Sequence, residues 1–315
     1  MQSYCLFAPA KINLHLEIIG DRPDGYHELV MVMQSVSLGD IIRIRANGRE
    51  EIRLFCNHPQ VPLDNTNLAY KAARRMQQEY PAASALGGGV DITIEKNIPV
   101  AAGLAGGSTD AAAVLVGINL LWKLGLTVPE LQQIGATLGS DVPFCISGGT
   151  ALATGRGEKI EPLPDLQNLW VILAKYESLS VSTPWAYKTY REKYSRQYLS
   201  NPEDIQRRTH QIHSGDLVKA ISQNNARQIG ALLYNDLEKV VLPAYPAVAE
   251  LIEAFRRKNV LGCIMSGSGP TVFALCESQS QGEEVISQVT AEINNPDLHC
   301  WLAQVCPHGI ITVQN

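Results

Sequence analysis

The most informative part of the chain reads Pro99-Val100-Ala101-Ala102-Gly103-Leu104-Ala105-Gly106-Gly107-Ser108-Thr109-Asp110. It joins an expected strand, residues 90–95, to an expected helix, residues 108–124. Glycine lets backbone N–H groups point outward and lets a phosphate approach closely, and a helix start offers free N–H donors and a positive dipole end. The stretch therefore predicts an anion-binding loop. These residues alone leave open an ordinary strand-to-helix turn capped by Ser108 or Thr109.

Two familiar nucleotide-binding loops do not fit this spacing. The chain has no Gly-x-x-x-x-Gly-Lys-Ser/Thr sequence, so the loop is not a Walker A loop. It also lacks a Gly-x-Gly-x-x-Gly sequence after its first expected strand, which argues against a dinucleotide-binding enzyme.

Length and composition are those of a soluble globular protein of about two domains. The 315 residues are 45% hydrophobic and 18% charged, with a formal net charge of -5. Because no long basic run or apolar span is present, we expect neither a nucleic-acid nor a membrane partner. The first ten residues do not resemble a secretory signal, so a cytoplasmic location is expected.

No metal site is predicted. The seven cysteines include no Cys-x-x-Cys pair and are expected to be reduced thiols. His210 and His213 could share a helix face, but no third ligand lies near them in the sequence.

Strands and helices alternate irregularly, and the first strands come in a run, which favours an α+β fold over a doubly wound parallel sheet. Strands are expected at residues 4–8, 12–19, 29–36, 40–44, 52–55, 90–95, 144–146, 150–154, 169–174, 262–265 and 271–274. Helices are expected at residues 68–80, 108–124, 129–138, 215–223, 225–234 and 247–258. A domain boundary near residue 160 divides the chain into residues 1–160 and 161–315.

The glycine-rich stretch resembles the central motif of the GHMP kinase superfamily, Pro-x-x-x-Gly-Leu-x-Gly/Ser-Ser-Ser/Thr. Two other segments resemble its first and third motifs: Ala8-Pro9-Ala10-Lys11-Ile12-Asn13-Leu14 and Met265-Ser266-Gly267-Ser268-Gly269-Pro270-Thr271-Val272-Phe273-Ala274. The resemblance implies a two-domain α+β GHMP kinase fold, with an N-terminal ATP-binding domain of the ribosomal-protein-like type and a C-terminal ferredoxin-like α/β sandwich. It also implies ATP as phosphate donor, with Mg²⁺, and an alcohol as acceptor.

Three segments narrow the resemblance to one branch of that superfamily: residues 9–14, 22–29 (Arg-Pro-Asp-Gly-Tyr-His-Glu-Leu) and 138–144 (Leu-Gly-Ser-Asp-Val-Pro-Phe). That branch phosphorylates the 2-hydroxyl of a cytidine-diphosphate-linked methylerythritol in the non-mevalonate isoprenoid pathway. Its partners are small molecules, and a monomer or weak homodimer is expected. The alternatives are a homoserine or mevalonate type of kinase, or a nucleotide sensor without activity, although Lys11 and Asp141 speak against a sensor.

The resemblance assigns catalytic roles to Asp141 and Lys11. Asp141 would accept the proton of the alcohol, whereas its sequence context equally fits an aspartate that only stabilises a turn. Lys11 lies in an apolar strand, where an ammonium group is costly without a partner; by analogy it pairs with Asp141, and the alternative is that it reaches solvent. Asn13 projects from the same strand face as Lys11 and would bind substrate.

By the same resemblance, Tyr26 and His27 bind the cytidine, Thr183 binds the diphosphocytidyl group and Trp185 faces the base. From the residues alone, Tyr26 and His27 equally fit a loop that packs on the core.

The chain departs from the superfamily motif at Ala101, Ala102 and Ala105, where many relatives have glycine; these alanines fit if their backbone angles are ordinary. Which of Ser108, Thr109 and Asp110 would contact Mg²⁺ is left open.

Overall fold

The computed structural model describes residues 2–314. Its largest feature is a mainly antiparallel eight-stranded sheet with the order β12-β1-β2-β4-β3, in which β5 pairs with β2, β6 with β5, and β8 with β1. Its strands are β1 (Ser3–Asp21), β2 (His27–Ala46), β3 (Ile52–Cys56), β4 (Val90–Glu95), β5 (Thr150–Gly155), β6 (Lys159–Pro162), β8 (Tyr234–Asn235) and β12 (Ile311–Val313).

The long β1–β2 pair corresponds to four shorter strands predicted from the sequence. The breaks predicted near Pro9 and Gly39 are irregularities within continuous strands, because the register of β1 on β2 shifts between Pro9 and Ala10. A bulge of this kind bends a strand and increases its twist without ending it. Lys11 and Asn13 follow the shift on β1, so the irregularity lies beside both predicted site residues.

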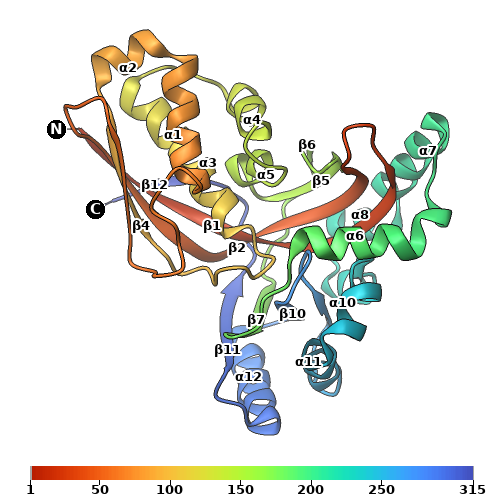
Figure 1. The fold of residues 1–315 in the computed structure, drawn as a ribbon. Helices are drawn as coiled ribbons and strands as arrows, with labels where there is room; N and C mark the ends of the chain where they lie inside the picture. Colours follow the sequence, from red (N-terminus) through yellow and green to blue (C-terminus); the bar gives the residue numbers. More distant parts are fainter. Residues whose placement is uncertain (1, 315) are drawn as a thin grey trace.

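Five helices lie over one face of this sheet (Figure 1). They are α1 (Leu68–Glu79), α2 (Pro81–Gly87), α3 (Gly106–Trp122), α4 (Val128–Ala136) and α5 (Val142–Ser147). The predicted start of α1 is confirmed, because Asn67 Oδ1 accepts a hydrogen bond of 2.8 Å from the backbone N–H of Ala69. Helix α3 is apolar on nearly all sides and is the central helix of this layer.

A second, four-stranded antiparallel sheet has the order β11-β7-β10-β9, and α11 and α12 pack against it (Figure 1). Its strands are β7 (Trp170–Tyr176), β9 (Gly262–Met265), β10 (Val272–Cys276) and β11 (Leu298–Gln304). The helices of this part of the chain are α6 (Thr183–Tyr194), α7 (Pro202–His213), α8 (Asp216–Ser222), α9 (Ala226–Ala231), α10 (Glu238–Ala244), α11 (Pro246–Arg256) and α12 (Gln279–Ile293), with a short 3₁₀ turn η1 (Ser195–Gln197) after α6.

The α+β fold is thus confirmed, one predicted element is wrong, and one is too long. Residues 144–146, predicted as a strand, lie in α5, where Pro143 near the helix start suits a helical turn. The helix predicted for residues 225–234 ends at Ala231, and Tyr234 begins β8. The expected ranges did not include α2, α6, α7, α10, α12, β6, β8, β11 or β12.

The boundary near residue 160 stays a prediction. Strand β6 still belongs to the first sheet, and the first strand of the second sheet begins at Trp170. The last strand, β12, returns to pair with β1. Within residues 2–314, no helix is long and apolar enough to cross a membrane.

Candidate active site

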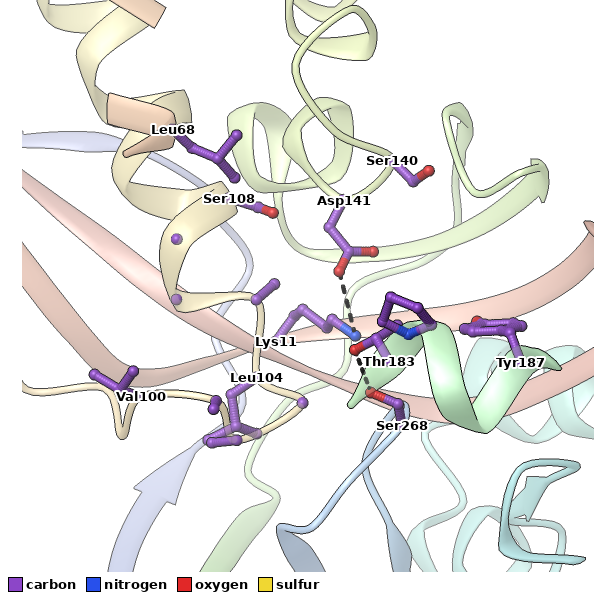
Figure 2. A pocket seen from close by; sticks show the side chains of 18 of the residues that line it. Lys11, Leu68, Val100, Leu104, Ser108, Ser140, Asp141, Thr183, Tyr187 and Ser268 are labelled. Carbon is purple, nitrogen blue, oxygen red and sulfur yellow. Dashed lines mark hydrogen bonds and ion pairs between the residues drawn. The ribbon is translucent and has the colours of Figure 1, made fainter. Parts of the chain in front are cut away.

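A cavity of about 780 Å³ lies where the three motifs meet (Figure 2). One end is lined by Val61, Pro62 and Leu68, and the glycine-rich loop forms the adjoining wall. The other end is lined by Tyr26, His27 and Tyr187, among others. Lys11, Asn13 and Asp141 also line the cavity, so most of the predicted site residues share one space.

Backbone contacts join the three motifs directly. The N–H of Lys11 donates to the carbonyl of Leu104 over 3.2 Å, and the hydroxyl of Ser266 donates to the carbonyl of Gly103 over 3.2 Å. Gly103 has a φ of 75°, and a Cβ at this position would lie 2.4 Å from the carbonyl oxygen of Ser266. Glycine is therefore required where the central motif crosses the third one.

Lys11 and Asp141 lie together in the cavity, although 130 positions separate them in the sequence. Lys11 Nζ is 3.7 Å from Asp141 Oδ2, and it donates to Asn13 Oδ1 over 2.7 Å. The Lys11 side chain is 6% exposed and that of Asp141 is 30% exposed. Asp141 precedes α5, and its side chain makes no capping bond to that helix. Its carboxylate is therefore available to a bound molecule, as Figure 2 shows.

The glycine-rich loop leads into α3 earlier than the sequence predicted. The helix begins at Gly106, and Ala105 occupies the N-cap position in a left-handed conformation. The prediction that Ser108 or Thr109 caps the helix is therefore wrong, because both lie within its first turn. Ser108 lines the cavity. Thr109 is fully buried and does not line the cavity.

The backbone angles of two loop alanines are not ordinary. Ala101 has a φ of 52° and Ala105 a φ of 58°, both in the left-handed region. An L-residue costs roughly 1–2 kcal/mol in this conformation. The condition set by the sequence analysis for alanine at these positions is thus not met, and the loop carries local backbone strain at the proposed anion site.

A buried charge cluster supports this loop, and the sequence analysis missed it. Lys96 Nζ donates to Asp40 Oδ2 over 2.5 Å and to Asp110 Oδ2 over 2.7 Å. Asp40 Oδ1 also accepts the backbone N–H groups of Asn97 and Ile98, at 2.6 and 2.8 Å. Burial and the charge of Asp40 raise the pKa of Asp110 to about 8, against the opposing charge of Lys96. The cluster ties the strand before the loop to the helix after it.

The opposite end of the cavity is aromatic. Tyr26 is 50% exposed, whereas His27 is 7% exposed. The His27 ring lies 5.2 Å from the ring of Tyr187, and its Nε2 has no hydrogen-bond partner among the described residues. Burial, with the nearby charge of Arg191, lowers the pKa of His27 to about 4, although Asp21 opposes the shift. The imidazole is therefore neutral at pH 7.

Comparison with known proteins agrees with this arrangement. Residues 67–149 match the model of the GHMP kinases N terminal domain, and residues 217–295 match that of the GHMP kinases C terminal domain. The chain is 61% identical over 310 residues to the 4-diphosphocytidyl-2-C-methyl-D-erythritol kinase of Gloeothece citriformis, covering 98% of each chain. It is 56% identical over 315 residues to that of Synechocystis sp., covering 100% of each. The chain belongs to the 4-diphosphocytidyl-2-C-methyl-D-erythritol kinase family of GHMP kinases.

Solved structures support the same family. A crystal structure of 4-(cytidine 5'-diphospho)-2C-methyl-D-erythritol kinase superposes with a TM-score of 0.72 at 29% identity, covering 96% of this chain and 99% of that chain. Homoserine kinase from Cytophaga hutchinsonii superposes with a TM-score of 0.75 at 21% identity, covering 99% and 98%. The similarity to homoserine kinase shows only that the two proteins share the GHMP kinase fold.

In this family member, helix α6 separates two predicted substrate residues. Thr183 lines the cavity, and its hydroxyl is 2.7 Å from that of Ser268 (Figure 2). Trp185 does not line the cavity, and its ring packs edge-on against Tyr245 at 5.6 Å. Tyr187 takes the place expected for Trp185, because residues four apart lie on one face of a helix. That spacing from Thr183 is the signal that could have identified Tyr187.

Proposed function

We propose that this kinase transfers the γ-phosphate of ATP to the 2-hydroxyl of 4-(cytidine 5'-diphospho)-2-C-methyl-D-erythritol, in the non-mevalonate route to isoprenoid precursors. One observation carries the proposal. A single cavity holds the Lys11–Asp141 pair together with the glycine-rich loop and the aromatic end around His27. With ATP on the loop and the cytidine at the aromatic end, the γ-phosphate and the 2-hydroxyl of the acceptor would both reach that pair. The cytoplasmic location of the protein and its state as a monomer or weak homodimer stay predictions.

The loop is the proposed triphosphate site. Its glycines leave room for phosphate oxygens, and the start of α3 at Gly106 offers unpaired N–H groups and a positive dipole end. The adenine would lie at the end lined by Val61, Pro62 and Leu68, where a planar base meets apolar side chains.

Mg²⁺ is proposed to enter with ATP. The described residues contain no group of three or more His, Cys, Asp or Glu side chains able to hold a metal by themselves. This fits Mg²⁺, which usually keeps several waters and binds substrate phosphates plus one or two side chains. The Ser108 hydroxyl lines the cavity and is the protein ligand we propose, with phosphate oxygens and water completing the coordination. The bound ion would neutralise phosphate charge during transfer.

The proposed reaction needs a proton acceptor for the hydroxyl and alignment of that hydroxyl with the γ-phosphate. Asp141 would accept the proton of the acceptor hydroxyl, a step typically worth 10²–10⁴-fold. The Lys11 ammonium lies 3.7 Å from this carboxylate and donates to Asn13 Oδ1, which would hold the ammonium in place. The ammonium would also attract the transferred phosphoryl group.

The aromatic end is proposed to bind the cytidine. Tyr26 and Tyr187 offer ring faces for stacking on the base, worth about 1–3 kcal/mol for each base contact. His27 is neutral and could exchange a hydrogen bond with the cytosine edge. Thr183, with Ser268 beside it, is proposed to bind the diphosphate.

A coupled assay of ADP release tests the proposal. We expect rapid release with the cytidine-linked substrate and little with homoserine, mevalonate or methylerythritol phosphate. Tyr26→Ala should lower kcat/KM for the cytidine-linked substrate about tenfold to a hundredfold, the loss of one stack, and leave the KM for ATP unchanged. Comparable turnover of homoserine or mevalonate would reject the proposed acceptor. Binding of ATP without ADP release from any acceptor would indicate a sensor.

A further inference from the structure

The turn between β5 and β6 presents one arginine to the cavity from a rigid frame. Arg156 lies between Gly155 and Gly157, which have φ values of 71° and 102°. A Cβ at Gly155 would lie 2.6 Å from the Glu158 carboxylate, and one at Gly157 would lie 2.7 Å from the methyl group of Met31. The N–H of Arg156 donates to Glu158 Oε2 over 2.8 Å. The backbone that carries this side chain is therefore fixed before any ligand binds.

The Arg156 side chain contacts both the loop that carries Tyr26 and the end of helix α4. Its Cζ lies 4.9 Å from the centre of the Tyr26 ring, over the ring face. Its Nη2 donates to the carbonyl of Ala136, the last residue of α4, where the negative end of the helix dipole favours a cation. Helix α4 leads within five residues to Asp141. The guanidinium thus lies between the loop of Tyr26 and the loop of the proposed base.

Arg156 also makes no direct ion pair with another described residue, although, after the hydrogen bond from Arg22, its charge helps to lower the pKa of Asp24. Among residues 2–314, no carboxylate lies within 4.0 Å of its guanidinium nitrogens, although the side chain is half-buried and lines the cavity. The other two cations at this end are paired. Arg191 Nε lies 2.8 Å from Asp21, and Lys188 Nζ lies 3.9 Å from Glu192. The partners of the Arg156 guanidinium, the Ala136 carbonyl and the Tyr26 ring, are both uncharged. A half-buried cation without a direct ion pair beside a substrate cavity indicates a site for an anion.

We infer that Arg156 is a substrate-positioning residue that binds the diphosphate of the cytidine-linked substrate while its guanidinium stacks on Tyr26. The inference rests on the proposed function. A planar guanidinium can donate paired hydrogen bonds to phosphate oxygens and can stack on a tyrosine face at the same time. One ring face of Tyr26 is covered by Arg156, which leaves the other face for the base. The aromatic end is then pre-organised, which reduces the ordering cost of binding.

The test compares three competitive inhibitors, cytidine, CMP and CDP, which form a ladder of increasing phosphate number. Their inhibition constants are measured on the wild type and on Arg156→Met. In the wild type, each added phosphate should tighten binding. In Arg156→Met, the gain from cytidine to CDP should shrink by about tenfold to a hundredfold, the loss of a charge-assisted hydrogen bond, while the KM for ATP stays the same. Arg156→Lys keeps the positive charge but lacks the planar guanidinium with its paired donors. It should therefore recover part of the gain in affinity from cytidine to CDP. Arg207→Met, an exposed arginine of α7 outside the cavity, is the matched control and should keep the wild-type ladder.

Each other outcome overturns a defined part of the argument. If Arg156→Met weakens cytidine and CDP equally, the guanidinium only supports Tyr26 and the diphosphate contact is wrong. If its ladder equals that of the wild type, Arg156 has no role in binding. If the wild type binds no cytidine compound at all, the proposed function fails before Arg156 is considered. Thermal unfolding of every variant separates these outcomes from misfolding, and Arg156→Lys decides the question if Arg156→Met does not fold.

Discussion

Lys11 and Asn13 show how polar partners are provided for an amino group in a largely buried position. The Lys11 ammonium has one neutral oxygen partner at 2.7 Å and one carboxylate at 3.7 Å. Because the carboxylate partner is 30% exposed, the pair is not fully removed from water, and its desolvation cost is lower than that of a deeply buried pair. A hydroxyl group could reach Asp141 through the part of its side chain that is still exposed.

Asp141→Asn tests the role of the carboxylate. The amide has the same shape but cannot accept the proton of the hydroxyl, so we expect kcat to fall by about 10²-fold or more. ATP binding should change little, because the loop and not Asp141 is the proposed phosphate site. The measurements are single-turnover rates and the Kd of a non-hydrolysable ATP analogue. A variant that keeps more than about a tenth of the wild-type kcat would exclude Asp141 as the base.

His27 predicts a pH dependence of stability. Its pKa in the folded protein is about 4, below its ordinary value of 6.5, so between these pH values the unfolded chain binds more protons at this residue. The free energy of unfolding should therefore decrease as pH falls from about 6.5 towards 4, by at most about 1.4 kcal/mol per pH unit.

Urea unfolding of the wild type and His27→Gln between pH 7 and 4.5 measures this contribution. The stability difference between the two proteins should change with pH below 6.5 and be constant above it. His210→Gln, which alters an exposed histidine of α7, should keep the wild-type profile. A constant difference between wild type and His27→Gln across the whole range would mean that His27 is not held neutral by the fold.

At the scale of elements, two neighbouring glycines of the glycine-rich loop have different functions. A Cβ at Gly106 would lie 3.0 Å from Lys96 Nζ and 3.2 Å from Ile98, whereas a Cβ at Gly107 would meet only Leu68, at 3.8 Å. Gly106 is thus needed for packing against the buried charge cluster. Gly107 is exposed in the cavity wall, where a side chain would occupy phosphate space.

Substitutions at these glycines should therefore differ. Gly107→Val is expected to raise the KM for ATP about tenfold or more, equivalent to about 1.4 kcal/mol, with the thermal midpoint unchanged. Gly106→Val should raise the KM and also lower the midpoint. Steady-state kinetics and thermal unfolding of both variants provide the comparison. An unchanged KM for ATP in folded Gly107→Val would show that this glycine serves only the turn.

The elements also show what the sequence can and cannot predict. Alternating apolar residues located most strands, and the motifs located the loop, Lys11 and Asp141. The apolar run at residues 144–146 was misassigned because a short buried helix and a short buried strand have the same composition. The Lys96 cluster had no local signal, since Asp40 and Asp110 are 56 and 14 residues away from Lys96. Trp185 had no signal that separated it from Thr183, because the helical period of α6 turns it towards Tyr245.

At the scale of the whole molecule, the cavity depends on both sheets. β1 of the first sheet contributes Lys11 and Asn13, and the turn between β9 and β10 of the second contributes Gly267 and Ser268. The side-chain amide of Asn235, in β8, donates to the carbonyls of Met265 and Gly267, at 2.8 Å each. A strand of the first sheet thus holds the turn of the second.

The last strand provides a test of this dependence. β12 pairs with Cys5, Leu6 and Phe7 of β1, so deleting residues 311–315 should expose that part of β1. We expect a loss of about 1–3 kcal/mol from the missing ladder hydrogen bonds, seen as a lower thermal midpoint. Deleting only residues 314–315, which follow the strand, should have little effect. Equal midpoints for the two truncated proteins would show that β12 does not stabilise the sheet.

The pairing of β12 with β1 has a consequence for chain connectivity. Cys5 lies opposite Val313 in antiparallel register, so the start of β1 and the end of β12 lie side by side. A few linking residues would turn these two strands into an ordinary hairpin. New ends could then be opened in an exposed turn such as the one at Gly48, between β2 and β3. The fold should therefore accept circular permutation, with Lys11 and Asp141 reaching the same cavity in a reordered gene.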